Sequence, residues 1–170
     1  MDGPTFHDVV KALLRNALDE AQAGHCESIT VEVTHDAVRV GDDGRGLPVH
    51  VHPRSGRALI EVILTGPRRG PRNTLAKING SCMWLEVEVH RDKELWVQRY
   101  EFAKPVTSLM KKGTTDERGT TMTCAPAVGE APGFDDLREL VRTLTEEASV
   151  PVKVRIHDRR VAKDETIVVV

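Results

Sequence analysis

An apolar stripe that recurs every four residues near the start of the chain constrains the fold most strongly. Its members are Val9/Val10, Leu13/Leu14, Ala17/Leu18 and Ala21. This spacing is typical of a helix that buries one face. Thr5 is a suitable N-cap for such a helix, and Gly24 is suited to end it. The sequence therefore predicts a helix over residues 5–23.

Alternating apolar and polar residues predict strands after this helix. Ile29, Val31 and Val33 alternate with polar residues, as in a half-buried strand. The same pattern predicts strands over 37–40, 83–90, 94–102, 105–109 and 119–124, and a terminal hairpin with arms at 152–156 and 165–170. Helices are predicted over 56–64 and 134–148, and an irregular surface segment over 66–73. This mixture indicates a sheet covered by helices on one face.

Length and composition set further limits. At 170 residues the chain has room for a single domain, which we assign to residues 1–170. Its three cysteines are far apart and form no CxxC pair, which favours a reducing compartment. No run is apolar enough to cross a bilayer and no signal peptide is legible, so a cytoplasmic location without a membrane partner is expected. Because the net charge is −2, direct DNA binding is not expected.

Two polar segments interrupt the structural pattern. In the first, Asn16 to Cys26, Asn16 is a mediocre helix former that stands four residues before Glu20, on a helical line apart from the apolar stripe. In the second, Val40 to Pro48, Asp42 ends a strand and precedes a glycine-rich turn, where the backbone can approach a ligand closely. A solvated helix-face Asn and a turn Asp beside hairpin glycines are the alternatives at this point.

These segments, with His52-Pro53 and the run from Glu61 to Thr65, resemble the gyrase B-like ATPase domains of the GHKL group, which share the Bergerat fold. The likeness continues through Leu85-Glu86-Val87, Gly119-Thr120-Thr121 and Leu137 to Leu140, so it spans nearly the whole chain in the family's order. It implies an α/β fold, a two-layer sandwich of the GHKL (Bergerat) type, with a mixed, mainly antiparallel sheet and helices on one face.

The resemblance also implies a ligand and residue roles. The ligand would be an adenine nucleotide, ATP or ADP, with Mg²⁺ held through the amide oxygen of Asn16. Asp42 would accept a hydrogen bond from the adenine amino group, and Thr120 would add a hydroxyl to the same network. The other residues implied to line this pocket are Glu20, Arg45, Gly46, Pro48 and Ile63. No structural metal is expected, because His50 and His52 have no further ligands near them.

The departures from the family fall on its catalytic parts. Ala12 stands where the family has a glutamate as general base, so no catalytic residue is assigned. Arg15 replaces an acidic residue that is common just before the Asn. The phosphate lid of the family is shortened around 66–78 and lacks a GxxGxG pattern. The chain begins near the first helix and ends where a first domain would end, so no exchanged arm, transducer domain or TOPRIM domain is expected.

We therefore expect weak nucleotide binding without efficient hydrolysis, in a regulatory or scaffolding module. Two alternatives remain at this point: a protein-interaction domain with a vestigial pocket, and an engineered, lid-deleted fragment of a type II topoisomerase ATPase domain. The three arginines of segment 66–73 could bind phosphate or a protein partner. The sequence leaves open whether the chain is an active enzyme, and in what oligomeric state.

Overall fold

The computed structural model describes residues 3–67 and 74–170. Within these ranges the helices are α1 (Phe6–Gln22), α2 (Leu59–Thr65), α3 (Thr74–Gly80) and α4 (Phe134–Ala148). The strands are β1 (Ser28–Val33), β2 (Val38–Asp42), β3 (Cys82–Arg91), β4 (Glu94–Glu101), β5 (Lys104–Pro105), β6 (Met110–Thr114), β7 (Gly119–Pro126), β8 (Val152–Asp158) and β9 (Lys163–Val169).

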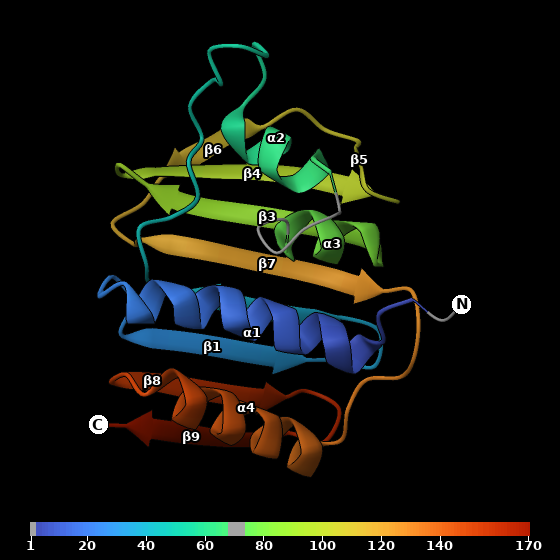
Figure 1. Ribbon diagram of the computed structural model, residues 1–170, viewed down its shortest axis with the longest axis vertical. Coiled ribbons are helices and arrows are strands. Elements are labelled where there is room, and N and C mark those ends of the chain that lie inside the picture. The colour runs from blue at the N-terminus through green and yellow to red at the C-terminus, as the bar shows by residue number, and fades with distance from the viewer. Residues whose placement is uncertain (1–2, 68–73) are drawn as a thin grey trace.

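All these strands belong to one sheet, in the order β5-β4-β3-β7-β2-β1-β8-β9, with β6 paired to β4 next to β5. Only the pairing of β1 with β8 is parallel. The four helices lie on the same face of the sheet (Figure 1). The predicted two-layer sandwich with a mixed, mainly antiparallel sheet is therefore confirmed. Across the described ranges, none of the helices has the length and apolar character needed to span a membrane.

The helix α1 lies at the centre of the helical layer. A capping box starts it: the Thr5 hydroxyl accepts a hydrogen bond from the backbone N–H of Asp8 at 3.2 Å, and the Asp8 carboxylate accepts from the Thr5 N–H at 2.8 Å. The predicted apolar stripe, together with Phe6, is at most 6% exposed. It packs on β2 and β7 and against α3 and α4. The polar side of α1 is thereby fixed in direction.

Two predicted elements needed correction. The strand predicted over 105–109 is wrong, because β5 ends at Pro105 and the next strand, β6, begins at Met110. Between them, the hydroxyl of Thr107 accepts the hydrogen bond of the Arg99 backbone N–H at 3.0 Å, in place of a strand partner. The helix predicted over 56–64 begins later, because a turn precedes it. In this turn the His52 N–H donates to the carbonyl of Arg57, and the Gly56 N–H donates to the carbonyl of His52.

The helix α3 was not predicted. Its seven residues bury Leu75, Ala76 and Ile78, but a run this short carries no clear helical period. It is held by the Asn79 side chain, which is 1% exposed and donates to the carbonyl of Leu64 at 3.0 Å. That carbonyl lies at the end of α2, so one buried amide joins the two short helices. The predicted irregular segment 66–73 lies largely outside the described residues.

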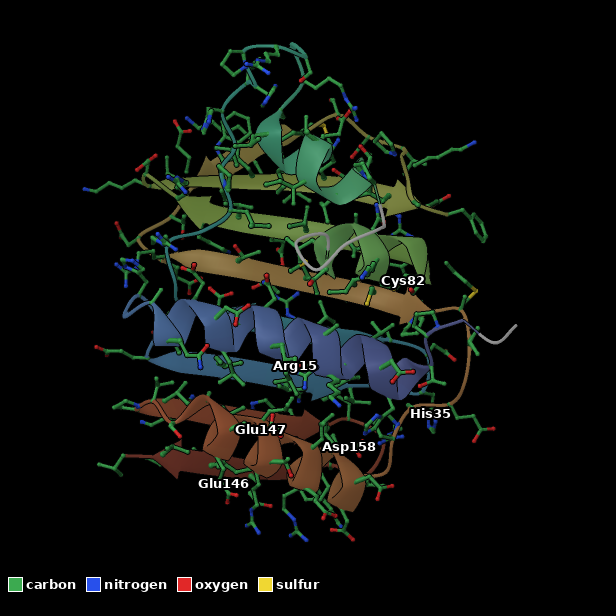
Figure 2. All side chains as sticks on the ribbon, in the orientation of Figure 1. Arg15, His35, Cys82, Glu146, Glu147 and Asp158 are labelled. Atoms are coloured by element: carbon green, nitrogen blue, oxygen red, sulfur yellow. The ribbon has the colours of Figure 1, made fainter. Side chains whose placement is uncertain are left out.

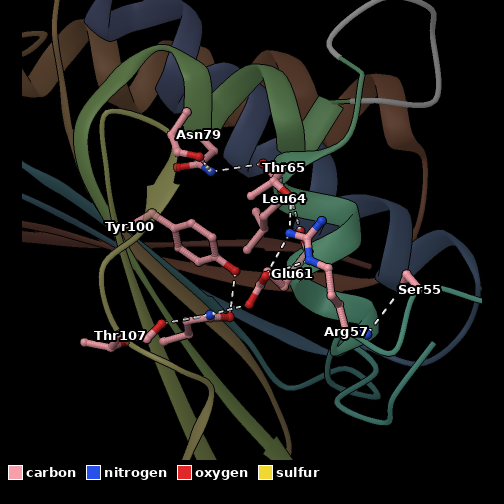
Figure 3. Close-up of polar contacts among 10 residues, drawn as sticks. Ser55, Arg57, Glu61, Leu64, Thr65, Asn79, Tyr100 and Thr107 are labelled. Atoms are coloured by element: carbon pink, nitrogen blue, oxygen red, sulfur yellow. Dashed lines mark hydrogen bonds and ion pairs between the residues drawn. The ribbon is translucent and has the colours of Figure 1, made fainter.

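A polar network fastens α2 to the sheet (Figure 3). The hydroxyl of Tyr100 donates to the side-chain oxygen of Gln98 at 2.7 Å, and both residues are fully buried. The Gln98 amide donates to the Glu61 carboxylate on α2 and to the carbonyl of Thr107, both at 3.0 Å. Arg57 completes the network with a 2.8 Å bond to Glu61. Since buried polar groups are costly when unpaired, this network fixes where α2 sits.

We expect Tyr100→Phe to lower the free energy of unfolding by about 1–3 kcal/mol, because the buried oxygen of Gln98 loses its donor. Urea denaturation followed by tryptophan fluorescence measures the change. Ser108→Ala, which removes an exposed hydroxyl without a hydrogen bond among the described residues, is the control and should stay within about 0.5 kcal/mol of the parent. Equal stability of Tyr100→Phe and the parent would contradict a structural role for the network.

Candidate functional site

The middle of α1 and the loop after β2 enclose a polar pocket of about 430 Å³. Its lining residues are Asn16, Asp19, Glu20, Asp42, Arg45, Gly46, Leu47, Pro48, Arg91 and Thr120. Seven of the eight residues predicted to bind nucleotide are thus together, although they come from three separate parts of the chain. The eighth, Ile63, lies elsewhere, as described below.

The sheet brings Asp42 and Thr120 together. β2 and β7 are antiparallel neighbours in which Gly41 lies opposite Thr121, so the next residue of β2 and the previous residue of β7 meet at one end. There a single carboxylate oxygen, Oδ1 of Asp42, accepts from the backbone N–H of Gly44 at 2.9 Å and of Thr120 at 3.3 Å. The register of the two strands therefore fixes the side chain at the base of the pocket.

The environment of Asp42 makes it an unusual carboxyl group. Burial, helped by the nearby charges of Glu20 and Asp43, raises its pKa to about 6 against the effect of the two backbone N–H donors. Its second oxygen, Oδ2, accepts no hydrogen bond from the described residues. Asp42 thus presents an acceptor to the pocket at neutral pH, and it can gain a proton in mildly acidic solution.

The adjacent Asp43 has a structural role instead. Its Oδ1 accepts from the backbone N–H groups of Glu27 at 2.8 Å and Ser28 at 3.0 Å, at the start of β1. The two carboxylates of the Asp42-Asp43 pair therefore point to different places. One lines the pocket, and the other ties the loop to the neighbouring strand.

Thr120 holds the loop over the end of the sheet. Its hydroxyl is in a residue only 5% exposed and accepts from the backbone N–H of Leu47 at 2.9 Å. The hydroxyl hydrogen is not used in that bond and remains available to donate. Thr120 thus fixes the loop and offers a donor beside the Asp42 acceptor.

An ion pair joins the same loop to α1. Arg45 donates through Nη2 to Oε1 of Glu20 at 2.7 Å, and through Nε and its backbone N–H to Oε2 at 3.2 and 3.1 Å. These hydrogen bonds lower the pKa of Glu20, which stays ionised. A side chain at position 44 would bring its Cβ to 2.8 Å from the Glu20 carboxylate, so the close approach of loop and helix depends on Gly44.

The sequence reading missed Arg91. It follows an alternating strand at the end of β3, a position with no motif to mark it, yet its Nη1 donates to the carbonyl of Gly46 at 2.7 Å. Gly46 has φ +80 and faces the carbonyl of His90 so closely that a Cβ would lie 2.9 Å from it. Asp19 was also missed, although it follows Asn16 by three residues, a spacing that shares a helix face.

A larger hollow of about 890 Å³ adjoins the pocket along the exposed side of α1. Asn16 and Asp19 line both spaces. Ala12 and Ile63 line only this second hollow, so the structure separates Ile63 from the group around Asp42. Its other walls come from α3 and α4. In the described ranges, no set of three or more His, Cys, Asp or Glu residues is placed to hold a metal ion.

Comparison with known proteins identifies the family. Residues 1–128, well over half of the chain, match the family described as "Histidine kinase-, DNA gyrase B-, and HSP90-like ATPase". The chain belongs to this family. Asn16 and Asp42, which the sequence reading took from the family's pattern, lie within the matched residues.

Gyrase B proteins are among the relatives of this family member. The chain is 38% identical over 136 residues to the DNA gyrase B protein of Thermotoga maritima, a match that covers 71% of this chain and 21% of the relative. It is 31% identical over 180 residues to the DNA gyrase B protein of Treponema pallidum, covering 94% and 28% respectively. The chain therefore spans less than a third of the length of these relatives.

The fold is shared with a solved structure, the topoisomerase IV ATP-binding domain of Francisella tularensis in complex with a small-molecule inhibitor. The TM-score is 0.87 at 21% identity, over 98% of this chain and 88% of the other. At this identity the likeness concerns the fold. It confirms the GHKL architecture expected from the sequence.

Gly119, which lies within the residues that match the family, allows β7 to approach Asp42 closely. Gly119 has φ +125, and a Cβ there would lie 1.9 Å from the carbonyl oxygen of Asp42. We expect Gly119→Ala to cost at least about 2 kcal/mol of unfolding free energy, because backbone strain and a clash act together. Thermal or urea denaturation measures the cost.

Gly113→Ala is the matched control, since a Cβ at position 113 meets nothing within 4 Å. It should change the unfolding free energy by less than about 1 kcal/mol. If both substitutions had the same small effect, β7 would not hold Asp42 in the way described.

Proposed function

We propose that this gyrase B-like domain binds an adenine nucleotide, ATP or ADP, with its base against Asp42 and Thr120. The observation that supports this proposal is Oδ2 of Asp42, the carboxylate oxygen in the pocket that accepts no hydrogen bond from the described residues. A partly buried acceptor without a protein partner suits an exocyclic amino group. The Thr120 hydroxyl supplies the complementary donor, and a pocket of about 430 Å³ is within the usual range for small ligands.

Asn16 fits the Mg²⁺ that would accompany the phosphates. Its amide lines both the pocket and the adjoining hollow, and it has no hydrogen bond to the described residues. An amide oxygen is a suitable ligand for Mg²⁺, which also keeps waters and phosphate oxygens in its shell. When bound, the ion would neutralise part of the phosphate charge. Asn16 would orient the ion beside the nucleotide.

The proposal includes weak binding and no efficient hydrolysis. Ala12 lies one turn before Asn16 on α1 and has no group that can take a proton from a water molecule. The stretch from Gly66 to Ile78 contains no GxxGxG sequence, the pattern typical of a glycine-rich phosphate-binding loop. We therefore expect the adenine base to contribute more to the binding affinity than the phosphates do.

A regulatory or scaffolding role in the cytoplasm follows as part of the same proposal. A nucleotide-binding domain without efficient turnover would report nucleotide occupancy to a partner rather than consume ATP. The arginine segment 66–73, whose residues 68–73 lie outside the described ranges, is the proposed contact for such a partner. A domain with a vestigial pocket would instead bind no adenosine at all, and calorimetry separates these cases.

The first test uses the pH dependence of adenosine binding. Adenosine needs an acceptor at Asp42, and protonation turns that acceptor into a donor. The affinity should therefore be constant above the Asp42 pKa of about 6 and decrease below it. We expect about a tenfold loss for each pH unit below that value, measured by calorimetry between about pH 8 and pH 5.

Asp42→Asn is the matched variant, since it keeps the size of the side chain and removes the titrating group. It should bind adenosine more weakly near neutral pH and should lose the dependence on pH. Denaturation of both proteins checks that the variant is folded. Adenosine binding that is as strong in Asp42→Asn as in the parent would remove the basis for the proposed base contact.

The second test restores a carboxylate at the general-base position. Ala12→Glu alone should not produce appreciable ATPase activity in the presence of ATP and Mg²⁺, measured as phosphate release. A general base supplies about 10² to 10⁴ in rate, whereas phosphoryl transfer also depends on positioning and charge stabilisation of the phosphates. Groups that act as a unit are not restored one at a time.

Ala12→Gln is the control for the added bulk of the side chain. Turnover by Ala12→Glu, but not by Ala12→Gln, at the level of an intact gyrase B ATPase domain would contradict the proposal. It would show that Ala12 is the single difference that prevents hydrolysis.

A further inference from the structure

Two cations line the hollow that adjoins the proposed nucleotide pocket. Lys11 and Arg15 stand four residues apart on α1, and Arg15 directly precedes Asn16. Figure 2 labels Arg15 on α1 and Glu147 on the neighbouring helix α4. Arg15 is exposed and Lys11 is half-buried. Neither has a carboxylate within 4.0 Å among the described residues, whereas Arg45 and Arg57 are both paired with glutamates.

The hollow also contains acidic residues, but they do not neutralise Arg15 by direct contact. The Asp8 carboxylate is engaged in the capping box at the start of α1. Partial burial raises the pKa of Asp19, one turn after Arg15, although the charge of Arg15 acts in the opposite direction. Glu147 comes from α4, the helix that packs beside α1, and lines the same hollow. Arg15 is therefore a cation with nearby acidic groups and no bound partner among the described residues.

The two spaces are joined where the phosphates would leave the pocket. Asn16 and Asp19 line both, so a nucleotide with its base at Asp42 would direct its phosphates past Asn16 into the hollow. Ala12, one turn before Asn16, is small and leaves room there. Arg15 and, one turn further along α1, Lys11 line the same hollow.

We propose that Arg15 and Lys11 bind the phosphates of the nucleotide, as a charge-based replacement for a glycine-rich phosphate loop. This inference rests on the proposed function and adds the residues that recognise the phosphate end. A guanidinium presents several donors in a planar fork that matches phosphate oxygens, and an ammonium acts as a point charge. Such a site favours anionic phosphates through charge, so its contribution decreases with salt.

The test compares adenosine, ADP, ATP and inorganic triphosphate by calorimetry, on the parent and on single variants. Arg15→Gln should weaken ATP binding about tenfold and leave adenosine binding within about twofold, because only the phosphates contact Arg15. Lys11→Gln should have a smaller effect of the same sign. Glu147→Gln should strengthen ATP binding, since it removes a competing negative charge from the opposite wall.

Arg54→Gln is the matched control. It removes the same charge from an exposed arginine that lines none of the described pockets, and it should change no affinity by more than about twofold. Weaker binding of inorganic triphosphate by Arg15→Gln than by Arg54→Gln would support the inference without any contact from the base.

The outcomes separate the inference from the proposed function. If adenosine and ATP both bind but Arg15→Gln keeps the parent's ratio of their affinities, the phosphate site is overturned and the base site stands. If adenosine does not bind the parent at all, the proposed function fails and the inference fails with it. Denaturation of each variant confirms that a loss of affinity does not come from unfolding.

Discussion

The packing of α1 on the sheet is the constraint on which the rest of the structure depends. Its apolar face is buried almost completely over β2 and β7, so the helix can neither rotate nor slide without exposing that surface. The position of the buried face also determines where the polar side chains of α1 point. Because the buried face is fixed, Asn16 and Glu20 must face the loop after β2, and Ala12 and Arg15 must face the adjoining hollow. A single hydrophobic stripe thus sets the direction of every polar group that α1 contributes.

The loop after β2 is held by contacts that leave one acceptor free. The ion pair of Arg45 with Glu20 attaches it to α1, the hydroxyl of Thr120 attaches it to β7, and Asp43 attaches it to β1. Asp42 is buried by the same arrangement, which raises its pKa. Burying a carboxyl group costs free energy unless it is paired. A carboxyl group in a pocket whose pKa is raised by burial is typical of a binding site.

Some charged side chains of α1 are paired within the fold, and others have no partner among the described residues. Glu20 is paired with Arg45 and Asp8 with the helix cap, so both serve the fold. Arg15 and Lys11 are not held in this way among the described residues, and both line the hollow that adjoins the pocket. Ala12 and the two cations are neighbours on one helix and line the same hollow.

The sequence by itself determined the layers of the fold and most of the pocket. The period of the apolar residues located α1, α4 and the long strands, and the motifs around Asn16 and Asp42 selected seven residues that the tertiary structure brings together. Only the tertiary structure decided the place of Ile63, the helix α3 and the contact of Arg91 with Gly46. The physical reason is the separation along the chain of the residues that interact. Periodicity and turn chemistry act between residues close in the chain, whereas Arg91 and Gly46 meet only because β3, β7 and β2 are neighbours in the sheet.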